Sequence, residues 1–154
     1  MMHDRSGGNM YLGLDLGTSG LRALLVEEHG SIIGSAEAGY GVKHPHSGWS
    51  EQNPADWTVA CEKAMASLRA AFPAAFSELR AIGVSGHMHG ATILDSAGQV
   101  LRPCMLWNDT RAHEEAKSLD AISKFDEVSG NIVFPGFTAP KVMWLAKHEP
   151  ETYS

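Results

Sequence analysis

The residues best suited to chemistry stand in a short polar segment between two apolar runs, residues 11–16 and 21–26. The segment and its borders supply one acid, two hydroxyls, two glycines and one base, namely Asp15, Gly17, Thr18, Ser19, Gly20 and Arg22. Glycines let the backbone adopt positive φ and bring N–H groups close to an anion. Hydroxyl and guanidinium groups donate hydrogen bonds to phosphate oxygens. The segment therefore predicts a phosphate-binding turn between two strands.

Asp15 needs a separate explanation, because a bare carboxylate repels phosphate. A bridging Mg²⁺ resolves the conflict, since this ion is usually held by one or two carboxylates together with substrate phosphates and water. An ordinary hairpin turn with a capping aspartate would explain an isolated Asp-x-Gly. Residues 18–20 and the apolar strand at 11–16, which we expect to be covered on both faces, favour nucleotide phosphate instead.

A second polar stretch, residues 85–90, follows a predicted strand at 79–85. Open α/β sheets bind ligands where such strands end. His87 and His89 alternate along an extended backbone, so they should point to opposite sides and not share a metal ion. From this stretch alone, a ligand-facing loop and a tight turn with satisfied histidines are equally supported.

Residues 106–111 offer a third group of polar and aromatic side chains before a predicted helix with Ala112, Ala116 and Leu119 on its inner face. Trp107 could form a flat wall against a sugar, and Asn108 and Asp109 could bind hydroxyl groups. Asp109 or Thr110 could instead cap the helix, and for Asp109 we favour capping. Residues 134–141 form an aromatic loop that opens a further helix through Trp144 and Leu145, where core packing is a sufficient explanation.

The elements that must position these groups follow a regular order. A third strand at 31–38 should return antiparallel to the second. Asn53 and Pro54 are typical of a helix start, and an apolar stripe continues to Phe72 before Pro73. Passage through that helix should place the strand at 79–85 parallel to an earlier one. A hairpin at 91–105 completes a predicted α/β fold.

Composition limits the classes of partner and location. The 154 residues are 44% hydrophobic and 19% charged, as in ordinary globular proteins. A net charge of −6 argues against nucleic acid as a partner. Two cysteines give no disulfide framework and favour the cytoplasm, and no apolar run is long enough to span a membrane. Residues 1–9 lack the apolar centre of a secretory signal and are predicted to be a disordered extension.

The phosphate-binding segment resembles the first phosphate motif of the superfamily that contains sugar kinases, actin and heat-shock chaperone ATPases. Four further segments, in this order, make the chain similar to the xylulokinases of the FGGY carbohydrate kinase family: residues 49–52, 86–91, 106–109 and 135–141. The resemblance implies a ribonuclease H-like fold, with residues 10–154 as the N-terminal portion of the first of two such domains.

The resemblance also implies functional roles. Asp15 would be the catalytic acid near Mg²⁺, which it would bind through water. Gly17, Thr18 and Ser19 would bind the phosphates of ATP, with Arg22 beside them. Met88 and His89 would contact the sugar, D-xylulose, together with Trp107 and Asn108. One residue departs from the family pattern, because His87 stands where a glutamine is usual.

The catalytic base of this family, an aspartate, lies beyond the part matched here. We therefore expect an N-terminal fragment, ending at Ser154, that is inactive alone and self-associates through exposed sheet edges. The alternatives are a non-catalytic nucleotide- or sugar-binding module, and a kinase for another ketopentose or polyol. A metal site on His87 and His89 is the least favoured. The oligomeric state stays open, with a homodimer as one candidate.

Overall fold

The computed structural model describes residues 8–122 and 124–153, which fall into two compact units. Unit 1 runs to Gly41 and continues from Ala55 to His87; unit 2 comprises Val42–Pro54 and the residues from Met88 onward. Of the extension predicted at 1–9, residues 1–7 lie outside the described residues, and Gly8 and Asn9 have no regular structure.

Unit 1 is built on a four-stranded sheet in the order β3-β2-β1-β5. Strands β1 (Met10–Leu16), β2 (Gly20–Glu27) and β3 (Ile32–Gly39) form an antiparallel meander. Strand β5 (Leu79–Gly86) pairs parallel to β1. The predicted meander, the crossover and the α/β class are thus confirmed.

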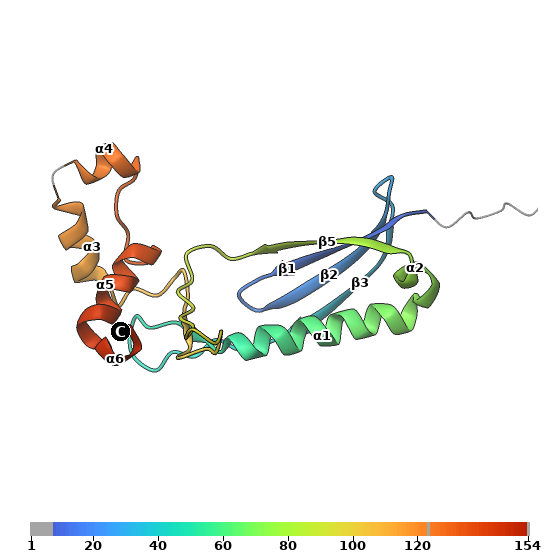
Figure 1. Cartoon of the computed structure of the whole chain (residues 1–154), viewed down its shortest axis with the longest axis horizontal. Coiled ribbons are helices and arrows are strands. Elements are labelled where there is room, and N and C mark those ends of the chain that lie inside the picture. Colours follow the sequence, from blue (N-terminus) through green and yellow to red (C-terminus); the bar gives the residue numbers. More distant parts are fainter. Residues whose placement is uncertain (1–7, 123, 154) are drawn as a thin grey trace, which may run out of the picture. The chain divides into compact units, whose positions relative to one another are not determined.

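Helix α1 (Pro54–Ala71) runs along one face of this sheet, and the short helix α2 (Pro73–Ser77) follows it (Figure 1). The predicted start at Asn53-Pro54 and the end before Pro73 are confirmed. The core forms where the helix meets the sheet, and its buried members are Met10, Leu12, Leu14, Leu21, Ala23, Leu25, Ala60, Ala64 and Leu68. Small alanines on α1 let the helix approach the larger leucines of the strands.

The other face of the sheet is open among the described residues. Along β1, buried Leu12 and Leu14 alternate with exposed Gly13 and Asp15, so the prediction that residues 11–16 are covered on both faces is wrong. Strand β5 is exposed along most of its length. The reason is that α1 covers one face only, which leaves the Asp15 side chain on the uncovered face.

Unit 2 has little sheet and several short helices. Strands β4 (Glu51–Gln52) and β6 (Cys104–Met105) form an antiparallel pair. The predicted helices after residues 111 and 137 are present, whereas β4, α4 and α6 were not predicted. The helices are α3 (His113–Asp120), α4 (Phe125–Ser129), α5 (Thr138–His148) and α6 (Pro150–Tyr153).

The hairpin predicted at 91–105 is only partly formed. Isolated bridges pair Leu94 with Val100 and Ala91 with Met105. The Asp95 carboxylate organises the turn by accepting hydrogen bonds from the backbone N–H groups of Ala97 at 2.9 Å and Gln99 at 2.7 Å. Within residues 8–122 and 124–153, no helix combines the length and apolar content needed to cross a bilayer.

We predict that the 154-residue chain self-associates through β5. Val84 on this strand is 74% exposed and Ile82 is 49% exposed, and an exposed apolar edge strand pairs with other chains. Val84→Lys should therefore shift the sedimentation-velocity distribution toward monomer. Val128→Lys, at a position 88% exposed on helix α4, is the control and should leave the distribution unchanged. A wild-type chain that sediments as a single monomer peak would contradict this prediction.

Candidate functional site

The turn between β1 and β2 is held in place by backbone groups and one tyrosine. The N–H of Gly17 donates to the carbonyl oxygen of Gly20 at 3.0 Å, and the N–H of Tyr40 donates to that of Ser19 at 3.2 Å. The Tyr40 hydroxyl donates to the carbonyl oxygen of Gly17 at 2.6 Å. Burial, and secondarily the nearby Asp15 carboxylate, raise the pKa of Tyr40, so the phenol keeps its donating proton. The turn is therefore held both by its own backbone hydrogen bond and by contacts from Tyr40.

The glycines of the turn allow neighbouring backbone segments to approach closely. Neither Gly17 nor Gly20 lies in the left-handed region, so the expectation of positive φ there is wrong. A Cβ on Gly20 would lie 2.8 Å from the carbonyl oxygen of Ala38 on β3. Glycine is needed at this position because the neighbouring strand leaves no room for a side chain.

Asp15 lines a pocket of about 300 Å³ at the end of β1. Gly17, Ser19 and Arg22 line the same pocket, so the structure brings together four of the five predicted phosphate-site residues. The fifth, Thr18, lies in the same turn and is partly buried. On the adjacent strand, Ser85 is the register partner of Asp15, and its hydroxyl donates to Asp15 Oδ1 at 2.8 Å.

Arg22 lines this pocket while it forms an ion pair with Glu37. It pairs in register with Asp15 across β1 and β2, and its Nη2 lies 2.6 Å from Glu37 Oε1. Both side chains of this ion pair are more than 60% exposed, at 64% and 62%. Solvent-exposed pairs contribute little, about 0–1 kcal/mol. The guanidinium can therefore exchange the Glu37 carboxylate for a phosphate oxygen at small cost.

The predicted sugar-binding residues are surface groups of unit 2. Met88 is 62% exposed and Trp107 is 47% exposed, and Asn108 is also exposed. His89 adopts a left-handed backbone with φ of 61° and stacks on Phe137, with ring centroids 4.6 Å apart. These side chains present an apolar thioether, two rings and an amide to solvent.

The two histidines of the 85–90 stretch have different surroundings. His87 packs edge-on against Trp57 within unit 1, with ring centroids 5.2 Å apart, whereas His89 packs on Phe137 within unit 2. In the described part of the chain, no three His, Cys, Asp or Glu side chains are arranged to hold a metal ion.

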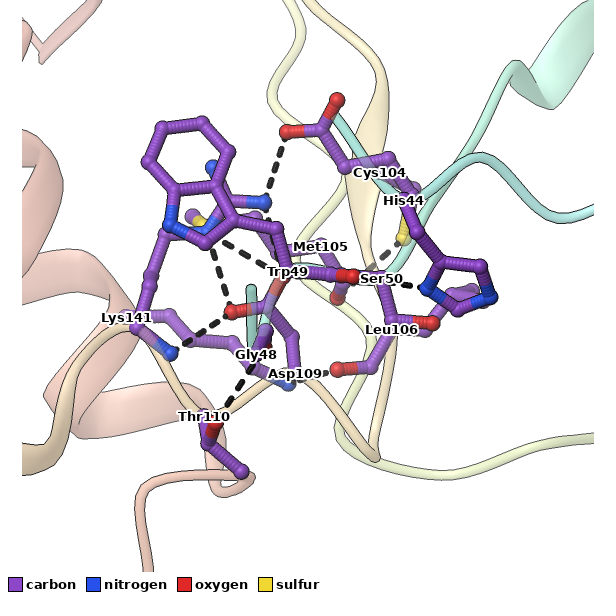
Figure 2. A network of polar contacts seen from close by, with 12 residues as sticks. His44, Gly48, Trp49, Ser50, Cys104, Met105, Leu106, Asp109, Thr110 and Lys141 are labelled. Atoms are coloured by element: carbon purple, nitrogen blue, oxygen red, sulfur yellow. Dashed lines mark hydrogen bonds and ion pairs between the residues drawn. The ribbon is translucent and has the colours of Figure 1, made fainter. Parts of the chain in front are cut away.

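Asp109 is buried and does not cap helix α3, which corrects the preferred prediction for this residue. The position that precedes the helix is Ala112, where no side chain caps the backbone, so Thr110 is not a cap either. The Asp109 carboxylate accepts hydrogen bonds from the N–H of Ser50 at 2.7 Å and from the N–H of Arg111 at 3.0 Å (Figure 2). The N–H of Asp109 donates to the carbonyl oxygen of Leu106 at 3.0 Å, which closes the turn that carries Trp107 and Asn108.

Arg111 neutralises two buried carboxylates. Its Nη2 lies 2.7 Å from Asp109 Oδ2 and 2.7 Å from Glu51 Oε1, and its guanidinium lies 3.5 Å from the centre of the Trp49 ring. Arg102 makes a second contact to Glu51 at 2.6 Å. This network ties the segment 49–52 to the turn at 106–109.

Sequence reasoning missed Ser85, Tyr40 and Arg111. A signal for Ser85 was available, because parallel pairing of the first and fourth strands places the ends of both strands side by side. Tyr40 and Arg111 act through contacts that span 23 and 60 positions, and no local pattern indicates these.

The chain matches the FGGY family of carbohydrate kinases, N-terminal domain, over residues 10–154. The chain belongs to the FGGY family. It is 44% identical over 146 residues to a xylulose kinase of Klebsiella pneumoniae, a match that covers 94% of this chain and 30% of that protein. FGGY sugar kinases also share its fold.

Two crystal structures document that likeness. A xyloylose kinase from Brucella ovis is 56% identical with a TM-score of 0.92, and a xylulose kinase from Rhodospirillum rubrum is 29% identical with a TM-score of 0.86. Each match covers 94% of this chain and 30% of the other. The chain thus spans about 30% of the length of these FGGY relatives.

The close approach at Gly20 leads to a prediction for stability. Gly20→Ala should lower the free energy of unfolding by about 1–3 kcal/mol, because its Cβ would overlap the β3 backbone. Gly83→Ala is the matched control in the same sheet. A Cβ at Gly83 meets nothing within 4 Å, so this variant should be neutral or slightly stabilising. Urea unfolding followed by circular dichroism measures both, and equal effects would contradict the crowding at Gly20.

The buried network in unit 2 leads to a second stability prediction. Arg111→Met should lower the free energy of unfolding by about 3–5 kcal/mol, because it leaves Asp109 and Glu51 without this cation. Lys117→Met is the control, because it removes a cation that is 71% exposed in the same unit. It should lower the free energy of unfolding by less than about 1 kcal/mol. Tryptophan fluorescence during urea unfolding reports on this region, since Trp49 lies under the guanidinium. A neutral Arg111→Met would refute the electrostatic role.

Proposed function

We propose that this chain provides the ATP-phosphate-binding and sugar-binding elements of an enzyme that phosphorylates D-xylulose to D-xylulose 5-phosphate. The observation that carries the proposal is the pocket in which Asp15, Gly17, Ser19 and Arg22 meet at the end of β1. Close similarity to proteins named xylulose kinase supports the choice of sugar. Because the chain matches only about 30% of their length, the proposal concerns a contribution to the reaction.

On the nucleotide side, Thr18 and Ser19 hold phosphate oxygens through backbone N–H and hydroxyl groups. Gly17, whose N–H already donates to Gly20, lets phosphate approach the turn closely because it has no side chain. Arg22 adds a positive charge once its guanidinium leaves Glu37. ATP is the nucleotide that the FGGY kinases imply. The exposed turn offers local hydrogen-bond donors to phosphate, so binding does not require a cluster of basic residues. This fits a chain whose net charge is −6.

Asp15 fits a role beside Mg²⁺. It offers a carboxylate on the open face of the sheet, and Ser85 orients one of its oxygens at 2.8 Å. A single carboxylate suits an ion that takes its remaining ligands from phosphate and water. When bound, Mg²⁺ would neutralise phosphate charge. Asp15 would be the residue that holds this ion beside the phosphates.

On the sugar side, Met88 and His89 would contact the ketose, and Trp107 and Asn108 would complete the surface. An indole face covers the C–H bonds of a sugar, while an amide both donates to and accepts from hydroxyl groups. His89 is held by stacking on Phe137, which orients its ring nitrogens.

Phosphoryl transfer depends mostly on positioning and charge neutralisation. The base that takes the proton from the terminal sugar hydroxyl would lie outside these 154 residues, so the chain alone should not transfer phosphate. We place the reaction in the cytoplasm, with a small sugar as substrate and neither nucleic acid nor a membrane as partner.

A chimeric enzyme tests this proposal. The chain is joined to the part of the Brucella ovis kinase that lies beyond the matched 30%, and ADP release is measured with Mg-ATP and D-xylulose, D-ribulose, L-ribulose, glycerol or gluconate. We expect a response to D-xylulose. Asp15→Asn should lower that rate at least 100-fold, because the carboxylate charge is lost. Asp126→Asn, on exposed helix α4, is the matched control and should be neutral.

Each outcome has a distinct meaning. A preference for another ketopentose or polyol would preserve the mechanism and overturn the sugar assignment. Full activity in Asp15→Asn would refute the role of the turn. A folded chimera that stays silent with every sugar would favour the alternative, a binding module without catalysis.

A further inference from the structure

The side chain of Lys141 is completely buried and makes three hydrogen bonds that the proposed chemistry does not use. Lys141 lies in the first turns of helix α5, on the same inner stripe as Trp144 and Leu145. A lysine is rarely fully buried without partners, because removing an ammonium from water is expensive. The described contacts show how this one is satisfied.

The ammonium donates to three backbone carbonyl oxygens, one from each of three separate segments. Lys141 Nζ lies 2.8 Å from the oxygen of His89, 2.7 Å from that of Leu106 and 2.7 Å from that of Gly136. An ammonium has three N–H donors and no acceptor, so its hydrogen-bonding capacity is filled. Figure 2 includes Lys141 together with Leu106, one of its three partners.

Two of the three segments carry side chains of the proposed sugar surface, and the third supports one of them. His89 is itself a proposed sugar contact, Leu106 precedes Trp107, and Gly136 precedes Phe137, on which His89 stacks. The segments also approach each other closely. A Cβ on Gly136 would collide with the carbonyl oxygen of Trp107. One side chain therefore reaches all three loops at the place where they meet.

We propose that Lys141 is a positioning residue that sets the relative placement of the three loops from which the sugar is recognised; this rests on the proposed function. Lys141 does not touch the sugar. It acts through the carbonyl groups of His89, Leu106 and Gly136, whose neighbours form the surface. Without the ammonium, the carbonyls of His89 and Gly136 would lose this donor, while that of Leu106 would keep the N–H of Asp109. A single group with three donors joins all three carbonyls at once.

The charge state of the ammonium makes this placement depend on pH. Burial lowers the pKa of Lys141 to about 8, an effect opposed by the Asp109 carboxylate and by Cys104 and reinforced by the Arg111 guanidinium. A neutral amine keeps two N–H donors, so one of the three carbonyls loses its hydrogen bond to Lys141. Burial raises the pKa of the Cys104 thiol, which keeps its own titration at higher pH.

The test uses the 154-residue chain with ¹³C-labelled carbonyls at His89, Leu106 and Gly136. In wild type, we expect all three ¹³C resonances to shift together between pH 6.5 and 9.5 with one midpoint near 8. Lys141→Met should displace all three resonances at pH 7 and weaken D-xylulose binding, followed by NMR titration, at least tenfold. Lys147→Met, at a position 64% exposed on the same helix, is the control and should bind within twofold of wild type.

The outcomes separate this inference from the function it rests on. A folded Lys141→Met that binds D-xylulose within twofold of wild type would overturn it. If that variant does not fold, the wild-type titration decides, and three different midpoints, or none in this range, would overturn it. If wild type binds no D-xylulose, the proposed sugar recognition fails, while a common midpoint would still establish that Lys141 joins the loops.

Discussion

Burial of charge is the constraint on which unit 2 depends. Among its described residues the unit has a two-stranded sheet and short helices, so extended strand pairing does not hold its loops. Charged side chains do this instead: the guanidinium of Arg111 joins Glu51 to Asp109, and the ammonium of Lys141 joins three loop carbonyls. Such groups are destabilising unless every partner is present. The geometry of the loops is therefore strongly specified even though regular structure is sparse.

In unit 1, strand pairing rather than buried charge positions the polar side chains. Its polar turn is a connection between paired strands, and the register of β1 with β2 and β5 places Arg22 and Ser85 on either side of Asp15. The supporting contacts are mostly backbone hydrogen bonds with the Tyr40 hydroxyl added. The register thus fixes the position of the acid, and α1 leaves its face uncovered.

These two solutions explain how much the sequence could predict. The meander, helix α1 and the parallel β5 were predictable, because apolar periodicity and the Asn53-Pro54 start are local signals. The gathering of Asp15, Gly17, Ser19 and Arg22 followed from their closeness in sequence. The cap at Asp109 was predicted wrongly because short-range rules favoured it, whereas a deciding partner, the N–H of Ser50, lies far away in the chain. Burial of 11–16 on both faces was inferred from composition, which does not reveal which faces are covered.

Lys141 shows where such reasoning reaches its limit. The spacing of Pro140, Lys141, Trp144 and Leu145 marks one helical stripe, and all four are buried. A lysine in such a stripe indicates that polar groups must converge on it, because its charge cannot be left alone in a core. The sequence does not reveal which groups these are, since three carbonyls from three loops carry no side-chain signature. Recognition through side chains could therefore be anticipated from residue types, whereas the placement of those side chains depends on backbone groups that only the folded chain brings together.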